Sequence, residues 1–328
     1  MSDADDDQRR KEPGAPVGQA TRVMTWNTLA GGWPRLDAIE AVIRDAQPDI
    51  IGLQEIEPRT LDALAERLGM KRAYGASCGG RGSPAGLLSR WPVRETTSHA
   101  GAPLRNALIE AVIEPPDAAP LRVFVAHLAG AYNFWRAGEG IRLRELRYTL
   151  ARLSRVKAES GEPCLLMGDF NSLAPGEPLR ASRLLLRAAD LDAQRAKGAK
   201  LSGLPGMEDV LPAPLRPLGR ALIGLARWQP TAALLDAGAG LYVPRAVIAE
   251  TRAAGLVDLA TAQPDSCEPR MTCPADFPAG RIDYIFASPA LASGLIACHA
   301  LSDTSTRSVS AASDHRPVLA TLVLPKRA

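Results

Sequence analysis

Residues 162–171 of the chain read EPCLLMGDFN, an apolar run that ends in a cluster of polar side chains. The run 163–167 has the length and composition of a buried strand, and Asp169 and Asn171 follow at its carboxyl end. Because Asp and Asn also favour ordinary turns, this stretch alone is compatible with a simple turn after a strand. It becomes informative because the same arrangement recurs along the chain.

Polar clusters lie in or beside five other segments that the sequence predicts to be strands. They are Thr25-Trp26-Asn27, Gln54-Glu55, His127-Leu128, Arg281-Ile-Asp-Tyr284 and Ser313-Asp-His-Arg-Pro317. Each alone has an ordinary explanation, such as a solvated glutamate, a turn or a core histidine. Six such clusters at strand ends are improbable as coincidences, and strand ends on a rigid sheet hold side chains in fixed positions. The sequence therefore predicts one shared site.

The side chains of this predicted site are four carboxylates, two histidines and two asparagines, with no cysteine. They are Glu55, Asp169, Asp283, Asp314, His127, His315, Asn27 and Asn171. Hard oxygen ligands suit Mg²⁺ or Mn²⁺ better than zinc. A cation held in this way can bridge to a substrate phosphate, and histidine can donate to a phosphate oxygen or act as a general base. The set predicts metal-dependent chemistry on a phosphate ester.

Hydrophobic patterning predicts the remaining elements. Strands are expected at 22–27, 49–53, 86–89, 105–114, 121–128, 162–168, 281–287 and 317–324, and helices at 35–46, 60–68 and 138–158. The strands lack a regular βαβ rhythm, which favours a mixed α/β sandwich over a doubly wound sheet.

The chain is predicted to hold one folded domain at 21–326. Residues 1–20 are polar and predict a disordered tail. The stretch 173–250 is rich in Ala, Leu, Pro and Gly, with helical fragments at 184–190 and 221–228. We interpret this stretch as an insertion or an elaborated connection.

The composition is that of an ordinary globular protein, with 46% hydrophobic and 23% charged residues in 328. The net charge is +3, and it becomes +5 without the acidic first twelve residues. A mildly basic body suits a polyanionic substrate such as nucleic acid, although a mixed-charge surface has the same balance.

The five cysteines contain no CxxC pair, so a zinc cluster is not predicted. Cys267 and Cys273 could close a small disulfide loop in an oxidising compartment. The first residues lack the apolar core of a secretory signal, and no apolar run reaches the length of about 18 residues that spans a bilayer. We therefore expect no transmembrane segment and a cytoplasmic location.

The ordered clusters resemble the endonuclease/exonuclease/phosphatase superfamily, whose members include deoxyribonuclease I, AP endonucleases, neutral sphingomyelinases and inositol polyphosphate 5-phosphatases. The resemblance covers about residues 21–325, apart from 173–250. Its strongest elements are 168–171 and Ser313-Asp-His-Arg-Pro-Val318, and Gly86-Leu-Leu-Ser-Arg-Trp-Pro92 resembles the family's strand-and-turn segment. It implies an α/β fold, a four-layer α/β/β/α sandwich of two packed mixed sheets with outer helices and a site at one edge.

The resemblance also implies a role for each motif residue. It implies that Glu55, with Asn27 beside it, and Asp314 bind the metal. It implies that Asp169 and Asn171 orient the attacking water and contact the phosphate. The histidine at the scissile phosphate is His315, with Asp283 as its carboxylate partner, and His127 matches a second histidine found in many members. The implied reaction is in-line attack by water, activated by Asp169 or His315, with Mg²⁺ or Mn²⁺ as cofactor.

Two departures bear on the substrate. Thr28-Leu29 follows Asn27, whereas AP endonucleases carry an Asp two places after that Asn, and the AP-type Tyr motif is not visible after His127. Both weigh against abasic-site repair. The predicted activity is a phosphodiesterase of the nuclease type, and the alternatives are a phosphatase or phospholipid-type phosphodiesterase and a non-catalytic binding module on the same fold.

Some residues outside the motifs are candidates for substrate contacts. Arg142 belongs to a basic helix face that could follow a phosphate backbone, although the solvated side of an amphipathic helix has the same composition. Trp33 and Tyr132 could line the cleft or stack on a base, or could simply pack. Leu222, Leu225, Ala226 and Trp228 could form a membrane-surface helix, but we favour their packing over the core.

Overall fold

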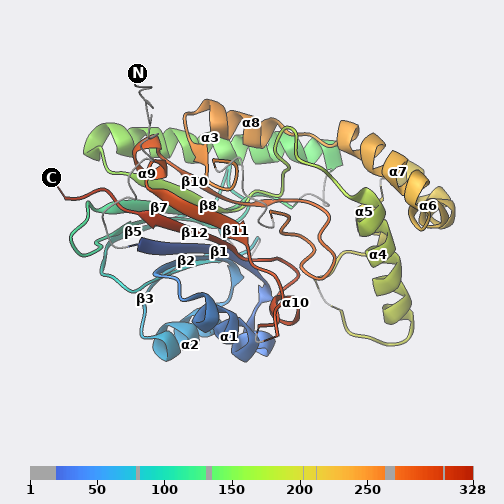
Figure 1. Cartoon of the computed structure of the whole chain (residues 1–328), viewed down its shortest axis with the longest axis horizontal. Helices are drawn as coiled ribbons and strands as arrows, with labels where there is room; N and C mark the ends of the chain where they lie inside the picture. Colours follow the sequence, from blue (N-terminus) through green and yellow to red (C-terminus); the bar gives the residue numbers. More distant parts are fainter. Residues whose placement is uncertain are drawn as a thin grey trace, which may run out of the picture.

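The computed structural model describes residues 20–78, 82–130, 135–201, 203–211, 213–262, 270–305 and 307–327. The predicted tail therefore lies almost wholly outside the described residues. Two six-stranded sheets pack face to face, with helices on both outer faces (Figure 1). This is the four-layer α/β/β/α sandwich that the motifs predict.

The first sheet has the strand order β11-β12-β1-β2-β4-β3. The bounds in that order are Leu295–Ala300, Val318–Val323, Ala20–Gly31, Ile50–Ile56, Ala85–Ser89 and Lys71–Gly75. Strands β1 and β2 are parallel, whereas β12 runs antiparallel to β1. The carboxyl ends of β1 and β2 therefore lie at the same edge as the amino end of β12.

The second sheet has the strand order β5-β6-β7-β8-β10-β9. The bounds in that order are Val93–His99, Leu108–Ile113, Leu121–His127, Cys164–Asp169, Asp283–Ala287 and Val257–Asp258. Strands β7 and β8 are parallel, and β10 runs antiparallel to β8 with Asp283 opposite Asp169. The carboxyl ends of β7 and β8 thus meet the amino end of β10.

Helices cover the outer face of each sheet (Figure 1). The helices that cover the first sheet are α1 (Leu36–Ala46), α2 (Pro58–Leu68) and α10 (Val309–Ala312). The helices that cover the second sheet are α3 (Trp135–Ser160) and α8 (Ala246–Ala253). Short elements η1 and α9 span Trp33–Arg35 and Pro289–Ala292. Buried apolar side chains fill both helix-to-sheet layers and the space between the sheets.

Burial on both faces explains why the central strands have continuous apolar sequences. Every residue of β7 and of β8 is buried, because each strand contacts the other sheet on one side and α3 or α8 on the other. The predicted strands and helices are present within a few residues of their expected bounds. The sequence did not predict β3, β5, β9 or β11.

Helices fill most of the stretch 173–250. The bounds are Ala181–Ala196 for α4, Met207–Val210 for α5, Ala213–Leu218 for η3, Gly219–Ala226 for α6 and Gln229–Tyr242 for α7. Helices α4, α6 and α7 form their own small apolar cluster around Leu185, Ala188 and Ala226. They lie at one end of the molecule, beside the sheets (Figure 1). That this stretch is an insertion stays a prediction.

Candidate active site

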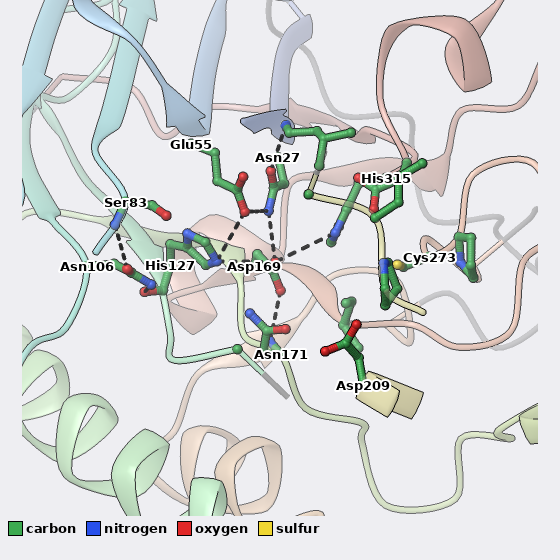
Figure 2. Close-up of a pocket in the computed structure, with 18 of the residues that line it drawn as sticks. Asn27, Glu55, Ser83, Asn106, His127, Asp169, Asn171, Asp209, Cys273 and His315 are labelled. Carbon is green, nitrogen blue, oxygen red and sulfur yellow. Dashed lines mark hydrogen bonds and ion pairs between the residues drawn. The ribbon is translucent and has the colours of Figure 1, made fainter. Parts of the chain in front are cut away.

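Sheet topology gathers the predicted residues at one edge of the sandwich. Asn27 and Glu55 lie near the carboxyl ends of β1 and β2, and His127 and Asp169 end β7 and β8. The segment before β12 brings Asp314 and His315 to the same edge, since β12 is antiparallel to β1. All six side chains line a single pocket (Figure 2).

The backbone at this edge adopts conformations that few residues tolerate. Glu55 and Asn171 have left-handed φ angles of 58° and 48°, and such strain outside glycine is concentrated at functional sites. Gly168 has φ 147°, and a Cβ there would lie 1.8 Å from the carbonyl oxygen of Ala126 in β7. Glycine is therefore required for β8 to pair closely with β7 immediately before Asp169.

Asp169 lies at the centre of the polar network (Figure 2). Its Oδ2 accepts a hydrogen bond from the Asn27 side-chain amide at 3.1 Å, and its Oδ1 accepts one from the Asn171 backbone N–H at 2.9 Å. The same Oδ2 lies 3.6 Å from Nε2 of His127 and 3.9 Å from Nε2 of His315. One buried carboxylate thus faces both histidines of the predicted site.

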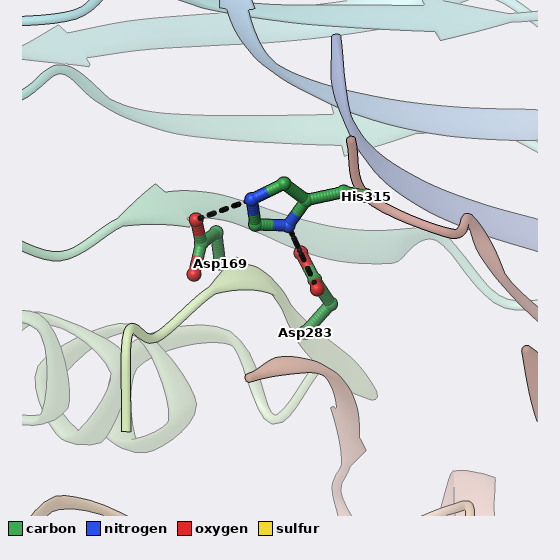
Figure 3. Close-up of side chains that lie close together, drawn as sticks. All are labelled: Asp169, Asp283 and His315. Carbon is green, nitrogen blue, oxygen red and sulfur yellow. Dashed lines mark hydrogen bonds and ion pairs between the residues drawn. The ribbon is translucent and has the colours of Figure 1, made fainter. Parts of the chain in front are cut away.

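Asp283 lies behind His315 and orients its ring (Figure 3). Nδ1 of His315 lies 3.1 and 3.0 Å from the two carboxylate oxygens of Asp283. Nε2, on the opposite side of the ring, therefore points to Asp169 and the pocket. The backbone is fixed as well, because the buried Trp26 indole donates to the His315 carbonyl at 2.8 Å.

The charges in the network shift one another's pKa. Burial, together with the negative charge of Asp283, raises the pKa of Asp169 to about 6, although His315 and His127 oppose the rise. Burial alone would lower the pKa of His315. The Cys273 thiol and the Asp283 carboxylate outweigh burial and hold the His315 pKa well above its ordinary value. At neutral pH we therefore expect Asp169 to be ionised and His315 to be protonated.

A second group of oxygen atoms suits a cation. Burial raises the pKa of Asp314, an effect that His315 opposes and the nearby Glu55 carboxylate reinforces. Among the described residues, Oδ1 of Asp314 is a buried atom without a hydrogen-bond partner. Two neighbouring carboxylates with an unsatisfied buried oxygen fit a hard divalent ion such as Mg²⁺.

Asn27 contributes to this group as a donor. Its Oδ1 accepts the N–H of Leu29 at 3.0 Å, which leaves Nδ2 to donate to Glu55 at 3.1 Å and to Asp169. The tightest group of possible metal-binding atoms is a different one, Asp169, Asp283 and His315, with atoms within 4.8 Å of one another (Figure 3). Asp283 and His315 are close because Nδ1 of His315 donates to the Asp283 carboxylate.

The pocket has a volume of about 500 Å³ and extends from the sheet edge to the helical stretch 173–250. Arg187 and Arg195 of α4 and Asp209 of α5 line its far wall. Its lining therefore mixes carboxylates, arginines and apolar side chains, which is neither a uniformly basic groove nor an apolar pocket.

Several pocket residues were not predicted from the sequence to belong to the site. Asn106 donates to the carbonyl of His127 at 2.9 Å and accepts the N–H of Ser83 at 2.7 Å. Cys273 lies beside His315 as a free cysteine whose thiol pKa burial raises. Cys267, with which Cys273 could close a disulfide loop, lies outside the described residues. None of these residues stands in a pattern that would distinguish it before folding.

The three predicted substrate-binding residues lie elsewhere or outside the described residues. Arg142 is buried, donates to the carbonyls of Ala129 and Gly130, and does not line the pocket. Trp33 is 40% exposed beneath the guanidinium of Arg59 and is also absent from the pocket wall. Tyr132 lies outside the described residues.

Two packed sheets with a pocket of carboxylates and histidines at one edge define a class of α/β phosphoesterase. A family model described as the Endonuclease/Exonuclease/phosphatase family matches residues 24–315. The chain belongs to this family, which implies hydrolytic activity on phosphate esters. No match is found among curated proteins.

Solved structures share the fold at low sequence identity. An endonuclease/exonuclease/phosphatase from Beutenbergia cavernae is 18% identical with a TM-score of 0.56, over 93% of this chain and 72% of that one. An AP endonuclease from Archaeoglobus fulgidus is 17% identical with a TM-score of 0.53, over 92% and 99%. A truncated TDP2 from Caenorhabditis elegans is 15% identical with a TM-score of 0.54, over 93% and 97%.

Proposed function

We propose that this protein is a Mg²⁺- or Mn²⁺-dependent phosphodiesterase of the nuclease type, which hydrolyses its substrate by in-line attack of water. The observation that carries the proposal is the position of Asp169, whose buried carboxylate faces Asn27, His127 and His315 at the pocket wall. A carboxylate in this position can accept a proton from water beside a bound phosphate.

Glu55 and Asp314, with Asn27 orienting Glu55, are the residues proposed to hold the cation. Their support is that both carboxylates line the pocket and that Oδ1 of Asp314 is a buried atom without a hydrogen-bond partner among the described residues. When bound, the cation would supply positive charge that offsets the charge developing on the phosphate and the leaving oxygen. The described chain provides oxygen ligands there, which Mg²⁺ and Mn²⁺ prefer.

The remaining residues are proposed to position water and phosphate. Because its pKa is raised, His315 holds a proton at neutral pH and donates from Nε2 to a phosphate oxygen, with Asp283 keeping the ring oriented. Asp169 is then the base for the attacking water, and Asn171 fixes its carboxylate through the backbone N–H. His127, the other histidine beside Asp169, is proposed as a second hydrogen-bond donor to the phosphate.

Nucleic acid is the leading substrate class. Two structural neighbours are named as an AP endonuclease and as TDP2, and the described pocket carries two arginines that can contact phosphates. A small or lipid phosphate ester is the alternative, because the pocket also has the apolar residues Leu29, Leu201 and Leu204.

The test is a substrate panel with the purified full chain in Mg²⁺, Mn²⁺ or EDTA. The panel contains supercoiled plasmid, single-stranded DNA, RNA, sphingomyelin, inositol phosphates and bis-p-nitrophenyl phosphate. We expect cleavage of a nucleic acid and of bis-p-nitrophenyl phosphate that needs the metal and stops in EDTA. Metal-dependent cleavage of lipid or inositol phosphate alone would replace the nuclease assignment. No cleavage together with no metal binding would favour a binding module.

A further inference from the structure

Exposed apolar side chains are concentrated in one short part of the described chain. Of the eleven large hydrophobic residues that are exposed, seven lie within 215–242. They are Leu215, Leu218, Leu225, Trp228, Leu234, Leu241 and Tyr242. We call η3, α6 and α7, residues 213–242, the apolar lobe. Scattered exposed apolar residues are ordinary, but a concentrated set marks an interaction surface.

The apolar lobe has a folded base, so its exposed residues are a surface feature and not an unformed core. Leu222 and Leu235 pack on the cluster that α4 forms with Val210 and Ala226. In contrast, Trp228 is 64%, Leu234 73% and Leu241 91% exposed. Helices α6 and α7 lie at the end of the molecule away from the sheets (Figure 1). The expectation that Trp228 and Leu225 pack over the core is therefore wrong.

The exposed charges of the apolar lobe are all positive. Arg216, Arg220 and Arg227 are exposed, and none of them forms an ion pair with a described residue. The lobe's single acid is Asp236, which is turned inward, where it accepts the N–H of Ser182 and lies 3.7 Å from Arg180. The outer surface thus combines apolar and aromatic side chains with positive charge alone.

We propose that the apolar lobe docks on the surface of an anionic lipid bilayer. Apolar side chains beside arginines are the composition of helices that lie in the membrane interface, and Trp and Tyr favour the headgroup level. Anionic headgroups can pair with the three arginines, which have no ion-pair partner among the described residues. This inference concerns where the protein works and does not depend on the proposed phosphodiesterase activity.

The geometry favours lying on the bilayer over crossing it. Among the described helices, none alone has the length and apolar character of a membrane span, although α7 and α8, bent by 55°, together have both. Helix α8 is held in the core: Val247 and Ile248 are fully buried, and the Glu139 carboxylate accepts the N–H of Ala246 at 2.8 Å. The pair is therefore not free to insert.

A second copy of the chain fits this surface less well. A two-fold dimer places the same patch against itself, so the arginines of both copies would face one another, and the apolar lobe itself has no exposed acid to pair with them. Like charges across an interface oppose association. The same arginines favour an anionic membrane, which is why the lipid surface is the better partner.

The test is co-sedimentation of the full chain with two kinds of vesicle, equimolar phosphatidylglycerol and phosphatidylcholine, or phosphatidylcholine alone. We expect binding to the anionic vesicles that weakens with salt, and little binding to the neutral ones. Arg220→Gln with Arg227→Gln should lower the partition coefficient about thirtyfold, the loss of two charges at an anionic surface. Trp228→Ser with Leu234→Ser should also lower it at least tenfold.

Ile296→Ser is the matched control, because Ile296 is 44% exposed on β11, outside the apolar lobe. This variant should bind as the wild type does. Circular dichroism of every variant shows whether the fold is retained. Absence of binding to anionic vesicles, or equal binding by the wild type and the lobe variants, would overturn the proposal. A concentration-dependent dimer that Trp228→Ser with Leu234→Ser abolishes, without vesicle binding, would assign the surface to a second copy instead.

Discussion

At the scale of the residue, Asp169 is proposed to accept a proton, so its ionisation should set the acid limit of activity. Burial and Asp283 raise its pKa to about 6. A raised pKa means that the carboxylate is lost as the pH falls through about 6, and kcat/KM should then fall about tenfold per pH unit. The measurement is kcat/KM for bis-p-nitrophenyl phosphate between about pH 4.5 and 8. A flat profile down to pH 5 would contradict the assignment of Asp169 as the base.

The pair of Asp283 and His315 gives a second prediction. Burial alone would lower the pKa of His315, whereas Cys273 and the Asp283 carboxylate raise it. Asp283→Asn removes a negative charge at 3.0 Å and should lower the His315 pKa, with loss of activity at neutral pH. NMR titration of the four histidines measures this. An unchanged His315 pKa in Asp283→Asn would show that the Asp283 carboxylate does not stabilise the protonated His315 ring.

The sequence indicated the residues that end strands and missed those that reach the pocket from loops and helices. Asp169 and Glu55 are recognisable because an apolar run precedes each of them. Arg187 has no such signal, since its position in the pocket depends on how α4 packs beside the sheets. Trp33 is close to a motif in sequence but lies beneath Arg59 and does not line the described pocket.

At the scale of the element, Gly168 decides whether β8 can pair with β7. A Cβ at this position would lie 1.8 Å from the Ala126 carbonyl oxygen, in a backbone with φ 147°. We expect Gly168→Ala to cost about 3 kcal/mol or more of unfolding free energy. Chemical denaturation measures the loss.

Gly161→Ala is the matched control for this prediction. Gly161 also has a positive φ, 66°, but no atom lies within 4 Å of the position that an added methyl group would take. The expected cost is about 1 kcal/mol, from the left-handed conformation alone. Equal losses in the two variants would show that the contact with β7 is not the cause.

The strands that the sequence predicted are largely buried on both faces, and the predicted helices beside the sheets each have an apolar face that packs on a sheet. Strand β7 is apolar throughout because it is covered on both sides, and its pattern is clear. Strand β5 reads VRETTSH and is mostly exposed, so it has neither an apolar run nor a regular alternation. Helix α7 was missed for a related reason: its Ala- and Gly-rich sequence has no buried residue and no apolar stripe.

At the scale of the whole molecule, a largely buried ion network joins α8 and β9 to the segment just before β10. Arg281, next to β10, donates to both oxygens of Asp258 in β9 at 2.8 and 2.7 Å, and Arg252 of α8 donates to the same carboxylate at 2.7 Å. Burial would raise the pKa of Asp258, but the two arginines outweigh it and lower the pKa. Removing one member of a buried pair typically costs about 3–5 kcal/mol.

This network predicts how stability depends on pH. A carboxyl whose folded pKa is lowered stabilises the fold above its unfolded pKa of about 3.9, and this contribution is lost as the pH falls through the lower folded value. Asp258→Asn should therefore be less stable than the wild type at neutral pH, and the difference should shrink below about pH 4. Urea unfolding at both pH values tests this. A difference that is constant with pH would contradict the ion-pair explanation.

The arrangement of the sheets could be predicted only through the motifs. Hydrophobic patterning gives strands but not their order, so the pairing of β1 with β12 from the far end of the chain has no local signal. The ordered motifs, through the resemblance that they carry, predicted the four-layer sandwich and a site at one edge of its sheets. For part of the apolar lobe, the sequence left a membrane-surface helix and packing over the core as alternatives, because the exposed face depends on which side of α6 and α7 packs against α4.

The central claim is that the carboxylate of Asp169 activates water in a metal-dependent hydrolysis. The most direct measurement is the rate of bis-p-nitrophenyl phosphate hydrolysis in Mg²⁺ by the wild type, Asp169→Asn and Asp190→Asn, where Asp190 is an exposed carboxylate of α4. We predict a loss of about 10²–10⁴-fold in Asp169→Asn with an unchanged circular dichroism spectrum, and a wild-type rate in Asp190→Asn. A rate in Asp169→Asn close to that of the wild type would contradict the account.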